Sequence, residues 1–354
     1  MSGPVSVVDK IREHFSNLEV DALLVTQPAN VRYLSGFTAP ADGRVLVTED
    51  EAVLITDGRY IAQAAEESRL AVEIAEQNWL EDVAEKIGQR RVGLESDHVT
   101  HALFHKMAEK LEREPVSTEG IIRNLRLRKT PEEIETLRQA VQITDEAYSH
   151  ILNFIRAGRK ELDMALELER FMRQAGAEAI SFEIIVASGV RSAMPHGVAS
   201  HKVIEQGDLV TLDFGARVDG YHADMTRAVA VGEISEELRA MFDAVLEAQE
   251  TALRALAPGK DGRDIDTLAR EVLSAKDLEE HFPHGLGHGV GLEIHEGPRL
   301  SRRISQTLEP GMTVTVEPGV YIPGRGGVRI EDLAVITENG YERLSQSDKS
   351  FVQV

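Results

Sequence analysis

A strong helix-start signal at residue 130 divides the chain into a shorter N-terminal part and a longer C-terminal part. Residues 130–133 place a threonine at the N-cap, a proline at the first helical position and a glutamate at the third, which together form a capping box. Apolar residues follow at helical spacing as far as Gly158. We interpret the basic stretch 123–129 before this helix as an exposed linker. The 354 residues are enough for two domains, expected at 1–125 and 126–354.

The first domain alternates short strands with helices. A β-hairpin is indicated where two apolar runs flank the acidic turn at 49–51. This alternation is typical of an α/β domain. The expected strands are 22–25, 44–48, 52–56 and 91–94, and the expected helices are 59–68, 80–87 and 101–111.

The second domain carries longer strands and helices closed by glycine or proline. Its pattern predicts an α+β domain, with an extended antiparallel sheet and helices on one face. Besides the helix that starts at 131, the expected helices are 162–174 and 236–256, and the expected strands are 182–187, 209–216, 221–231, 313–316 and 328–336.

The charge is strongly negative and uneven. The net charge is −21, of which −6 falls on residues 1–129 and −15 on residues 130–354. This balance argues against binding nucleic acid or an anionic membrane surface and favours a cation site in the second domain. The chain has no cysteine, which excludes thiolate metal ligands and cysteine nucleophiles. No signal-like or membrane-spanning segment is evident, so we expect a cytoplasmic protein.

Two aspartates flank a hairpin turn in the second domain. Asp213 ends an apolar strand, Asp219-Gly220 is a typical two-residue turn, and Asp224 lies on the returning strand. Directly paired hairpin residues are an odd number of positions apart, as these aspartates are, so both side chains point to one face. Two such close carboxylates need a proton or a cation between them. The alternative is one exposed aspartate and one that caps the turn.

Histidines cluster further along the chain. Four of the 12 fall between His281 and His295, interspersed with glycines that allow close backbone approach. Glycine at this density disfavours the helical histidine spacing of many metalloproteases. A lone histidine is usually packed or hydrogen-bonded, but a glycine-spaced group in an acidic chain is also a candidate metal site.

Two glutamates complete the candidate site. Glu317 ends a strand before Pro318-Gly319, and Glu331 lies inside an apolar strand, where a buried carboxylate needs a partner. Arg329 is on the same face and could supply a structural salt bridge instead. Four carboxylates would balance two divalent cations. Oxygen ligands with one imidazole favour Mn²⁺, Co²⁺ or Zn²⁺, and such an ion pair can activate a water molecule.

These motifs resemble the pita-bread metallopeptidases, a family that includes methionine aminopeptidase, aminopeptidase P and prolidase. The aspartate hairpin, the histidine–glycine stretch and the two glutamates follow Pro195-His196-Gly197 in the chain. Residues 30–37 and 56–60 are similar to the N-terminal segments of the proline-specific branch. The resemblance covers nearly the whole chain. It implies a creatinase-like α/β N-terminal domain followed by an α+β pita-bread catalytic domain.

The resemblance also implies a set of metal ligands. Asp213 would bind the first ion, Asp224 and Glu331 would bridge both ions, and His288 and Glu317 would complete the second. The implied cofactors are two divalent ions per chain, with manganese first and cobalt or zinc as alternatives. Hydrolysis would proceed by attack of a hydroxide held between them.

Further roles follow from the same resemblance. Glu317 would accept the proton of the nucleophile and relay it to the leaving nitrogen. His196 and His295 would line the substrate cleft and hydrogen-bond the scissile carbonyl and the proline side. His284 would orient the ligands from behind, and Arg329 would brace the bridging carboxylates.

The implied substrate is a peptide with proline at the second position. The nitrogen of an Xaa-Pro bond carries no hydrogen, which defeats ordinary backbone recognition by proteases. A prolidase, which cleaves Xaa-Pro dipeptides, should cap the proline carboxylate with a cation, whereas aminopeptidase P should leave that end open. Arg299 and Arg44 are our main candidates for the cap, with Arg191 and Arg325 as further possibilities, and these cations favour an Xaa-Pro dipeptidase.

Three alternatives remain open at this stage. The chain could be an aminopeptidase P that acts on longer peptides. It could be a methionine aminopeptidase, although those chains are usually shorter and lack the N-terminal domain. It could also be a metal-free binding module of this fold, although such relatives lack the five ligands. A homodimer is common among relatives and is expected here.

Overall fold

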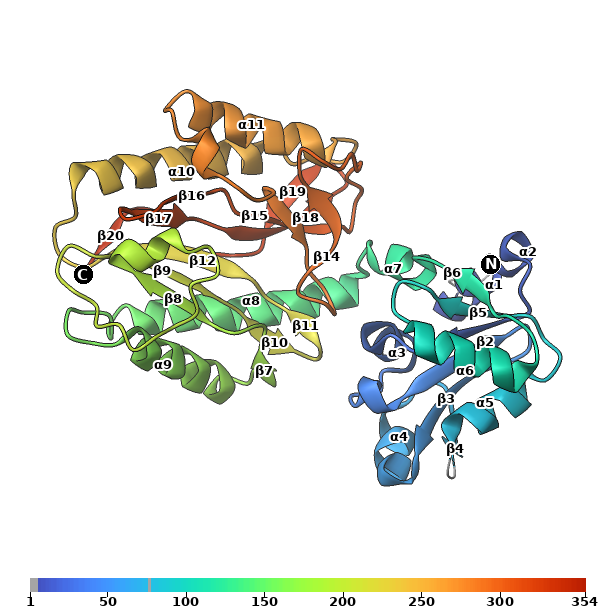
Figure 1. The fold of residues 1–354 in the computed structure, drawn as a ribbon. Helices are drawn as coiled ribbons and strands as arrows, with labels where there is room; N and C mark the ends of the chain where they lie inside the picture. Colours follow the sequence, from blue (N-terminus) through green and yellow to red (C-terminus); the bar gives the residue numbers. More distant parts are fainter. Residues whose placement is uncertain (1–5, 76–77) are drawn as a thin grey trace. The chain divides into compact units, whose positions relative to one another are not determined.

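The computed structural model describes residues 6–75 and 78–354, which form two compact units, Met1–Arg126 and Leu127–Val354 (Figure 1). Within these residues, no helix is both long and apolar enough to cross a membrane.

The first unit is built on one six-stranded sheet of mixed direction. Its strand order is β4-β3-β2-β1-β5-β6, with β1 antiparallel to β2 and parallel to β5. Alternate residues of β1 enter two apolar clusters, one on each face, because successive strand side chains point to opposite sides. The strands are β1 (Ala22–Val25), β2 (Arg44–Thr48), β3 (Ala52–Asp57), β4 (Ala71–Ala75), β5 (Val92–Glu95) and β6 (Val116–Thr118).

Helices cover both faces of this sheet, which confirms the α/β prediction. The predicted hairpin is present as β2 and β3. Strand β1 ends at Val25 as expected, and Pro28 is then the first residue of a helix that Gln27 caps. The helices are α1 (Val7–Arg12), α2 (Phe15–Leu18), α3 (Pro28–Ser35), α4 (Ile61–Glu67), α5 (Trp79–Ile87), α6 (His101–Leu111) and α7 (Ile121–Arg126), the last of which occupies part of the predicted linker.

The second unit contains four long helices and several sheets, in which all strand pairs are antiparallel except the parallel pair of β12 and β20. The longest sheet has the order β20-β12-β9-β8, and a three-stranded sheet has the order β15-β18-β19. The helices are α8 (Pro131–Ile151), α9 (Glu161–Gln174), α10 (Glu236–Arg254) and α11 (Gly262–Ser274). The strands are β7 (Ala179–Ile180), β8 (Ile185–Ser188), β9 (Leu209–Phe214), β10 (Ala216–Val218), β11 (Tyr221–His222), β12 (Met225–Ala230), β13 (Gly287–Gly289), β14 (Glu296–Leu300), β15 (Thr313–Val316), β16 (Gly319–Ile322), β17 (Gly326–Arg329), β18 (Asp332–Thr337), β19 (Gly340–Arg343) and β20 (Val352–Gln353).

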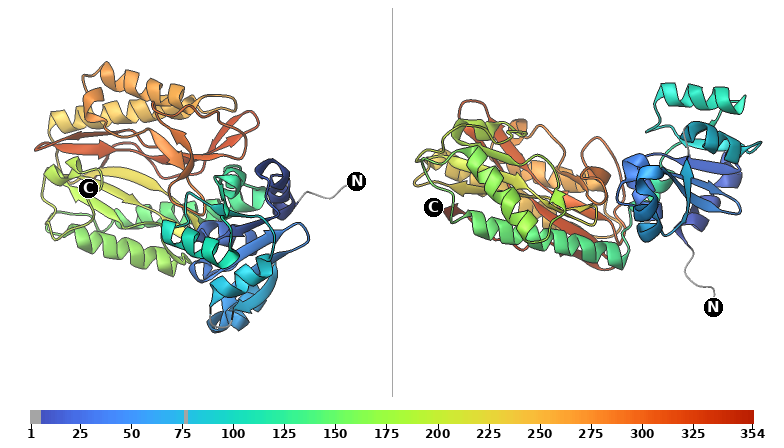
Figure 2. Two further views of the ribbon diagram at one scale, coloured as in Figure 1. Left: turned by 45° about the vertical axis from the view of Figure 1, so that its right-hand side comes forward. Right: turned by 90° about the horizontal axis from the view of Figure 1, so that it is seen from below.

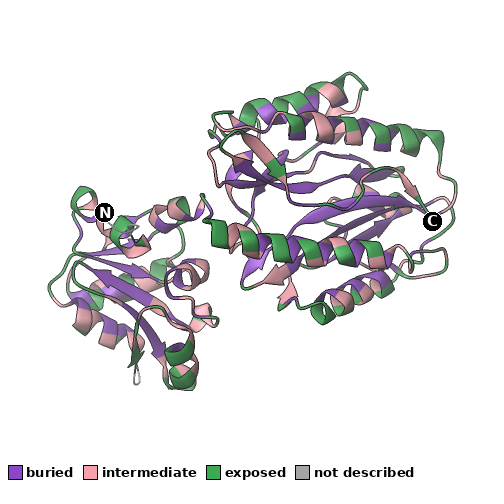
Figure 3. Ribbon diagram, turned by 180° about the vertical axis from the view of Figure 1, so that it is seen from behind, coloured by how far each residue is buried: buried purple, intermediate pink, exposed green. Residues whose placement is uncertain are grey.

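The helices of this unit lie on two opposite faces of the strands, and our expectation of helices on one face was wrong. Figure 1 shows α8 and α9 on one side and α10 and α11 on the other, and the two views of Figure 2 agree. Each pair has its own apolar cluster against the strands. The strands between them are buried while the outer helix surfaces are exposed, as Figure 3 shows. The sequence shows that each helix has one apolar face, but it does not show on which side of the strands the helix packs.

The helix start at residue 130 is formed as predicted. The Thr130 hydroxyl accepts a hydrogen bond from the Glu133 backbone, and the Glu133 carboxylate accepts one from the Thr130 backbone. The helix is shorter than its apolar pattern suggests. It ends at Ile151, and the chain turns before it reaches Gly158.

Candidate metal centre

The hairpin of β9 to β12 brings the two aspartates onto one face. Strands β9 and β12 pair Asp213 with Thr226. Asp224, two positions before Thr226, therefore lies diagonally opposite Asp213 on the same side. The hairpin closes through Asp219 and Gly220, whose φ angles of 45° and 80° match a two-residue turn.

The histidine–glycine stretch forms strand β13 and carries His288 toward the aspartates. Glycine is required on both sides of it. A Cβ atom at Gly287 would lie 2.0 Å from the Thr315 carbonyl oxygen, and one at Gly289 would lie 1.8 Å from the Gly297 carbonyl oxygen. The close approach to β15 lets the Thr315 hydroxyl accept a 3.0 Å hydrogen bond from the His288 backbone. The glycines thus allow the packing that fixes the imidazole.

Carboxylates from three other segments surround this imidazole. His288 Nε2 lies 3.3 Å from Oε1 of Glu317 and 3.6 Å from Oδ2 of Asp224. Asp224, His288 and Glu331 each offer one ligand atom, and these atoms lie within 4.8 Å of one another. Asp224, His288 and Glu331 are all buried.

Several buried carboxylates of this cluster lie close enough to raise one another's pKa values. Burial, followed by the charges of Glu331 and Asp213, raises the pKa of Asp224 well above its ordinary value. Burial, followed by the charges of Glu317 and Asp213, does the same to the pKa of Glu331. Burial also raises the pKa of Asp213, against the opposing charge of Arg329.

Glu317 differs from the other carboxylates. Burial alone would raise its pKa, but the hydrogen bond and positive charge of His288 outweigh this effect and lower the pKa to about 2. Glu317 thus stays ionised as a proton acceptor must before it takes up a proton.

The residues present fit a pair of divalent cations. Among the described residues, two buried oxygens of this cluster, Oδ1 of Asp213 and Oε1 of Glu331, have no hydrogen-bond partner. Unpartnered buried carboxylate oxygens are costly unless a cation binds them. The donor set of four carboxylates and one imidazole suits Mn²⁺, Co²⁺ or Zn²⁺.

A cavity of about 660 Å³ opens onto the cluster. This volume is within the usual range for small-ligand sites. Its wall is partly apolar, with Phe182, Ile185, Val198, Ile294 and Ile304 among the lining residues. All the predicted site residues of the second unit line it, namely His196, Asp213, Asp224, His284, His288, His295, Arg299, Glu317, Arg329 and Glu331.

His295 and Arg299 reach this cavity from beside His288. The His295 ring lies 4.4 Å from the His288 ring, between centroids. His295 is an exposed residue, yet its partial desolvation and the neighbouring His288 lower its pKa to about 4. Arg299 pairs directly with His288 across β13 and β14, so both side chains lie on one face.

Arg44 is in the first unit. Its guanidinium lies over the Trp79 ring, 4.5 Å from the centroid, and donates to the Gly43 carbonyl oxygen at 3.3 Å. Its predicted contact with a substrate carboxylate remains a prediction.

Arg329 braces a different carboxylate from the ones we expected. It donates to Oδ2 of Asp213 at 2.5 Å rather than to Asp224 or Glu331. Its other nitrogens hold the Tyr321 hydroxyl at 2.7 Å and the Thr226 hydroxyl at 3.0 Å. Arg329 is the last residue of β17, which lies against β9, the strand that carries Asp213.

The supporting residues Tyr321 and Thr226 were missed by the sequence analysis. His284 Nε2 lies 3.0 Å from the Tyr321 hydroxyl, which thus connects His284 to Arg329. The Thr226 hydroxyl donates to Oε2 of Glu331 at 2.7 Å. Strand alternation could have indicated Thr226, since it shares a face with Asp224, but no local pattern marks Tyr321.

An α/β unit followed by an α+β unit with a carboxylate–imidazole cluster under a cavity fits the class of metal-dependent hydrolases. Comparison with known proteins gives the family. The metallopeptidase family M24 model matches residues 135–338, and the creatinase/prolidase N-terminal domain model matches residues 8–128. The chain belongs to metallopeptidase family M24, as the resemblance in the sequence indicated.

Relatives of similar length share both units. An Xaa-Pro dipeptidase of Pyrococcus furiosus is 38% identical, over 98% of this chain and 99% of its own. The solved structure of an Xaa-Pro dipeptidase from Bacillus anthracis has a TM-score of 0.94 at 44% identity, covering 98% of this chain and 99% of that one. An X-Pro aminopeptidase structure from Thermotoga maritima has a TM-score of 0.89 at 37% identity, covering 97% and 100%.

Proposed function

We propose that this protein is an Xaa-Pro dipeptidase that depends on two divalent metal ions. The observation that carries the proposal is the convergence of Asp224, His288 and Glu331, with ligand atoms within 4.8 Å of one another, at the base of a partly apolar cavity. Relatives named as Xaa-Pro dipeptidases, similar over nearly their whole length, support the substrate class. The proposed ligands are Asp213, Asp224, His288, Glu317 and Glu331.

The ions, when bound, would lower the pKa of a water molecule and polarise the scissile carbonyl. Glu317 accepts the proton of the attacking water and returns it to the proline nitrogen as the bond breaks. Its place directly after β15, with Oε1 3.3 Å from Nε2 of His288, puts this carboxylate beside the proposed metal ligands.

The cavity residues orient the peptide. His196 and His295 hydrogen-bond the scissile carbonyl and the proline side, and the lowered pKa of His295 keeps its ring neutral. The apolar wall formed by Phe182, Ile185 and Ile304 offers a surface for the proline ring. Such positioning is the main contribution that binding residues make to catalysis.

Arg299 is the residue that favours a dipeptidase over an aminopeptidase P. It lies on the same face as His288 and lines the cavity, where its guanidinium can pair with a substrate carboxylate. Aminopeptidase P remains the second candidate, because the X-Pro aminopeptidase structure of Thermotoga maritima is also similar over the whole chain.

A comparison of three peptides with Mn²⁺ added tests the proposal. We expect the purified protein to cleave Ala-Pro faster than Ala-Pro-Ala and to leave Met-Ala-Ala intact. A preference for Ala-Pro-Ala would make the protein an aminopeptidase P. Cleavage of Met-Ala-Ala alone would make it a methionine aminopeptidase, and inactivity of the manganese-loaded protein on all three would contradict the proposed function.

Manganese as the native metal, a homodimeric assembly and a cytoplasmic location belong to the same proposal. They are predictions from the sequence and its resemblance to the family. Metal analysis and light scattering would test the first two directly.

A further inference from the structure

A network of buried charges lies directly behind the proposed ligand Glu331. Its members are Arg227 of β12, Asp332 at the start of β18, Gln249 of α10 and Lys349 of the C-terminal segment. Arg227 is 1% exposed, and Asp332 and Gln249 are fully buried. None of the four belongs to the proposed ligand set. Charged groups are rarely buried this deeply without a specific set of partners.

Arg227 uses all five of its N–H groups. Nη1 donates to the carbonyl oxygens of Thr226 at 2.9 Å and Glu331 at 2.5 Å. Nη2 donates to Oδ1 of Asp332 at 2.8 Å and to the Ser347 carbonyl oxygen at 2.9 Å. Nε donates to the Asp348 carbonyl oxygen at 3.2 Å. This one side chain thus joins β12, the backbone of a proposed ligand and the C-terminal segment.

The main chain of Glu331 is fixed at both polar groups as a result. Its carbonyl oxygen accepts from Arg227, and its N–H donates to the Thr226 carbonyl oxygen at 3.1 Å. The Thr226 hydroxyl also holds Oε2 of the Glu331 side chain. The remaining oxygen, Oε1, has no partner among the described residues and is the one left for an ion.

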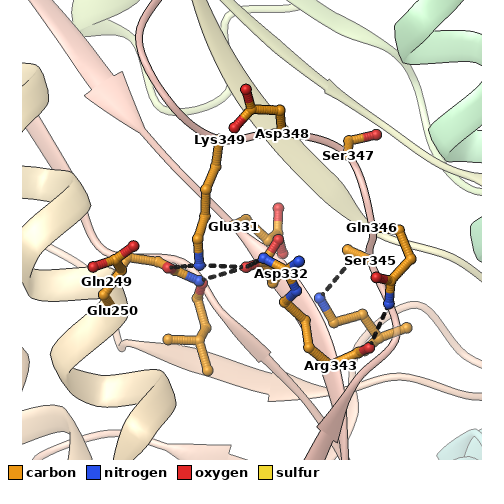
Figure 4. A network of polar contacts seen from close by, with 12 residues as sticks. Gln249, Glu250, Glu331, Asp332, Arg343, Ser345, Gln346, Ser347, Asp348 and Lys349 are labelled. Carbon is orange, nitrogen blue, oxygen red and sulfur yellow. Dashed lines mark hydrogen bonds and ion pairs between the residues drawn. The ribbon is translucent and has the colours of Figure 1, made fainter.

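Lys349 of the C-terminal segment reaches Asp332 and Gln249, as Figure 4 shows. Lys349 donates to Oδ2 of Asp332 at 2.8 Å and to Oε1 of Gln249 at 2.7 Å. Gln249 in turn donates to Oδ2 of Asp332 at 3.1 Å. Further along, the backbone of Ser347 donates to Asp145 of α8 at 2.8 Å. The segment therefore ties α8 and α10 to the start of β18, directly after Glu331.

We propose that Arg227, Asp332 and Lys349 are positioning residues for the metal centre, through which the C-terminal segment sets the affinity of the site for its ions. The inference rests on the proposed function, since it assumes that Glu331 binds metal. Residues that hold a ligand from behind commonly change metal affinity by about 10- to 100-fold when they are replaced. None of the three touches the cavity or the substrate.

Lys349→Met is the most informative variant. It removes one cation of the network, while Asp332 keeps Arg227 at 2.8 Å, so the chain is expected to fold. We expect the EDTA-stripped variant to bind Mn²⁺ about tenfold more weakly than the wild type by isothermal titration calorimetry. Lys349→Arg restores the cation and should bind within about threefold of the wild type. Arg227→Met should weaken binding further.

A matched control separates positioning from general destabilisation. Leu168→Ala shortens a fully buried side chain of α9, a helix that contributes no residue to this network. It should lower the melting temperature but leave Mn²⁺ affinity unchanged.

The outcomes are distinguishable. Wild-type affinity in Lys349→Met and Arg227→Met would overturn the inference, as would an equal loss of affinity in Leu168→Ala. If the wild type itself binds no Mn²⁺, the proposed function fails rather than the positioning role alone.

Discussion

Glu331 and Asp332 are neighbours in the chain, both buried, yet their surroundings are opposite. Glu331 lies among carboxylates, and burial together with the charges of Glu317 and Asp213 raises its pKa well above the ordinary value. Burial would raise the pKa of Asp332 too, but the charges of Arg227 and Lys349 outweigh it, and the pKa lies below the ordinary value.

The difference teaches that burial alone does not decide the state of a carboxylate. The protein supplies the cations for Asp332, whereas for Glu331 it leaves an oxygen without a partner and collects three more carboxylates. A site of the second kind is stable in its ionised form only when cations come from solution. The alternation of side chains along an extended chain is what separates the two environments by a single residue.

The largest predicted effect is on catalysis. Glu331→Ala and Asp224→Ala should each lower kcat/KM for Ala-Pro by at least about a thousandfold, or about 4 kcal/mol, because each removes a proposed bridging ligand. Both proteins should remain folded by circular dichroism. Glu342→Ala, at an exposed position of β19, is the control and should retain activity. Near wild-type rates in either ligand variant would contradict the bridging assignment.

Neutralising the two neighbours should change stability in opposite directions. In EDTA-treated protein, Glu331→Gln relieves repulsion and should raise the free energy of unfolding. Asp332→Asn leaves Arg227 and Lys349 buried without their carboxylate and should lower it by about 3 kcal/mol. Urea denaturation of both variants measures the difference. If both substitutions changed the free energy of unfolding in the same direction, the two carboxylates would not differ in the way we describe.

Metal binding should stabilise the protein. Mn²⁺ at about 100 times its dissociation constant should add about 2.7 kcal/mol, which for a unit of this size is a rise in melting temperature of about 5–10 °C. The same addition to Glu331→Ala should give a much smaller rise. Equal rises in the two proteins would place the binding of Mn²⁺ elsewhere.

The candidate carboxylate clamps should affect short substrates selectively. Arg299→Ala should reduce cleavage of Ala-Pro about tenfold and of Ala-Pro-Ala much less, because only the dipeptide presents its carboxylate beside the scissile bond. Arg44→Ala should show the same bias if that arginine contributes. Equal effects on both peptides would remove the arginine concerned as a clamp.

The smallest change in the free energy of unfolding is expected when the exposed Arg138 is replaced. Arg138 pairs with Glu342 at 2.8 Å, but both side chains are more than 40% exposed. Arg138→Ala should therefore change the free energy of unfolding by less than about 1 kcal/mol. A loss comparable to that of Asp332→Asn would mean that exposure does not separate these two kinds of ion pair.

The sequence predicted those features that local rules determine. The capping box at Thr130 and the hairpin at Asp219-Gly220 follow from short-range chemistry, and the hairpin register then places Asp213 and Asp224 on one face. The expected ligand set came from ordered motifs and family resemblance.

Long-range partner choice could not be predicted in the same way. Arg329 was assigned to the bridging carboxylates but binds Asp213, which is 116 positions away in the sequence. Arg227 joins segments more than 100 positions apart, and no local pattern distinguishes it from an exposed strand arginine. Such contacts depend on how strands from different sheets pack.

Anomalous diffraction from crystals soaked in Mn²⁺ tests the central claim most directly. The account predicts two manganese peaks, about 3.5–4 Å apart, with Asp224 and Glu331 touching both and with Asp213, His288 and Glu317 completing the coordination. Manganese peaks only at other positions, or a cluster without manganese in protein that cleaves Ala-Pro, would contradict it.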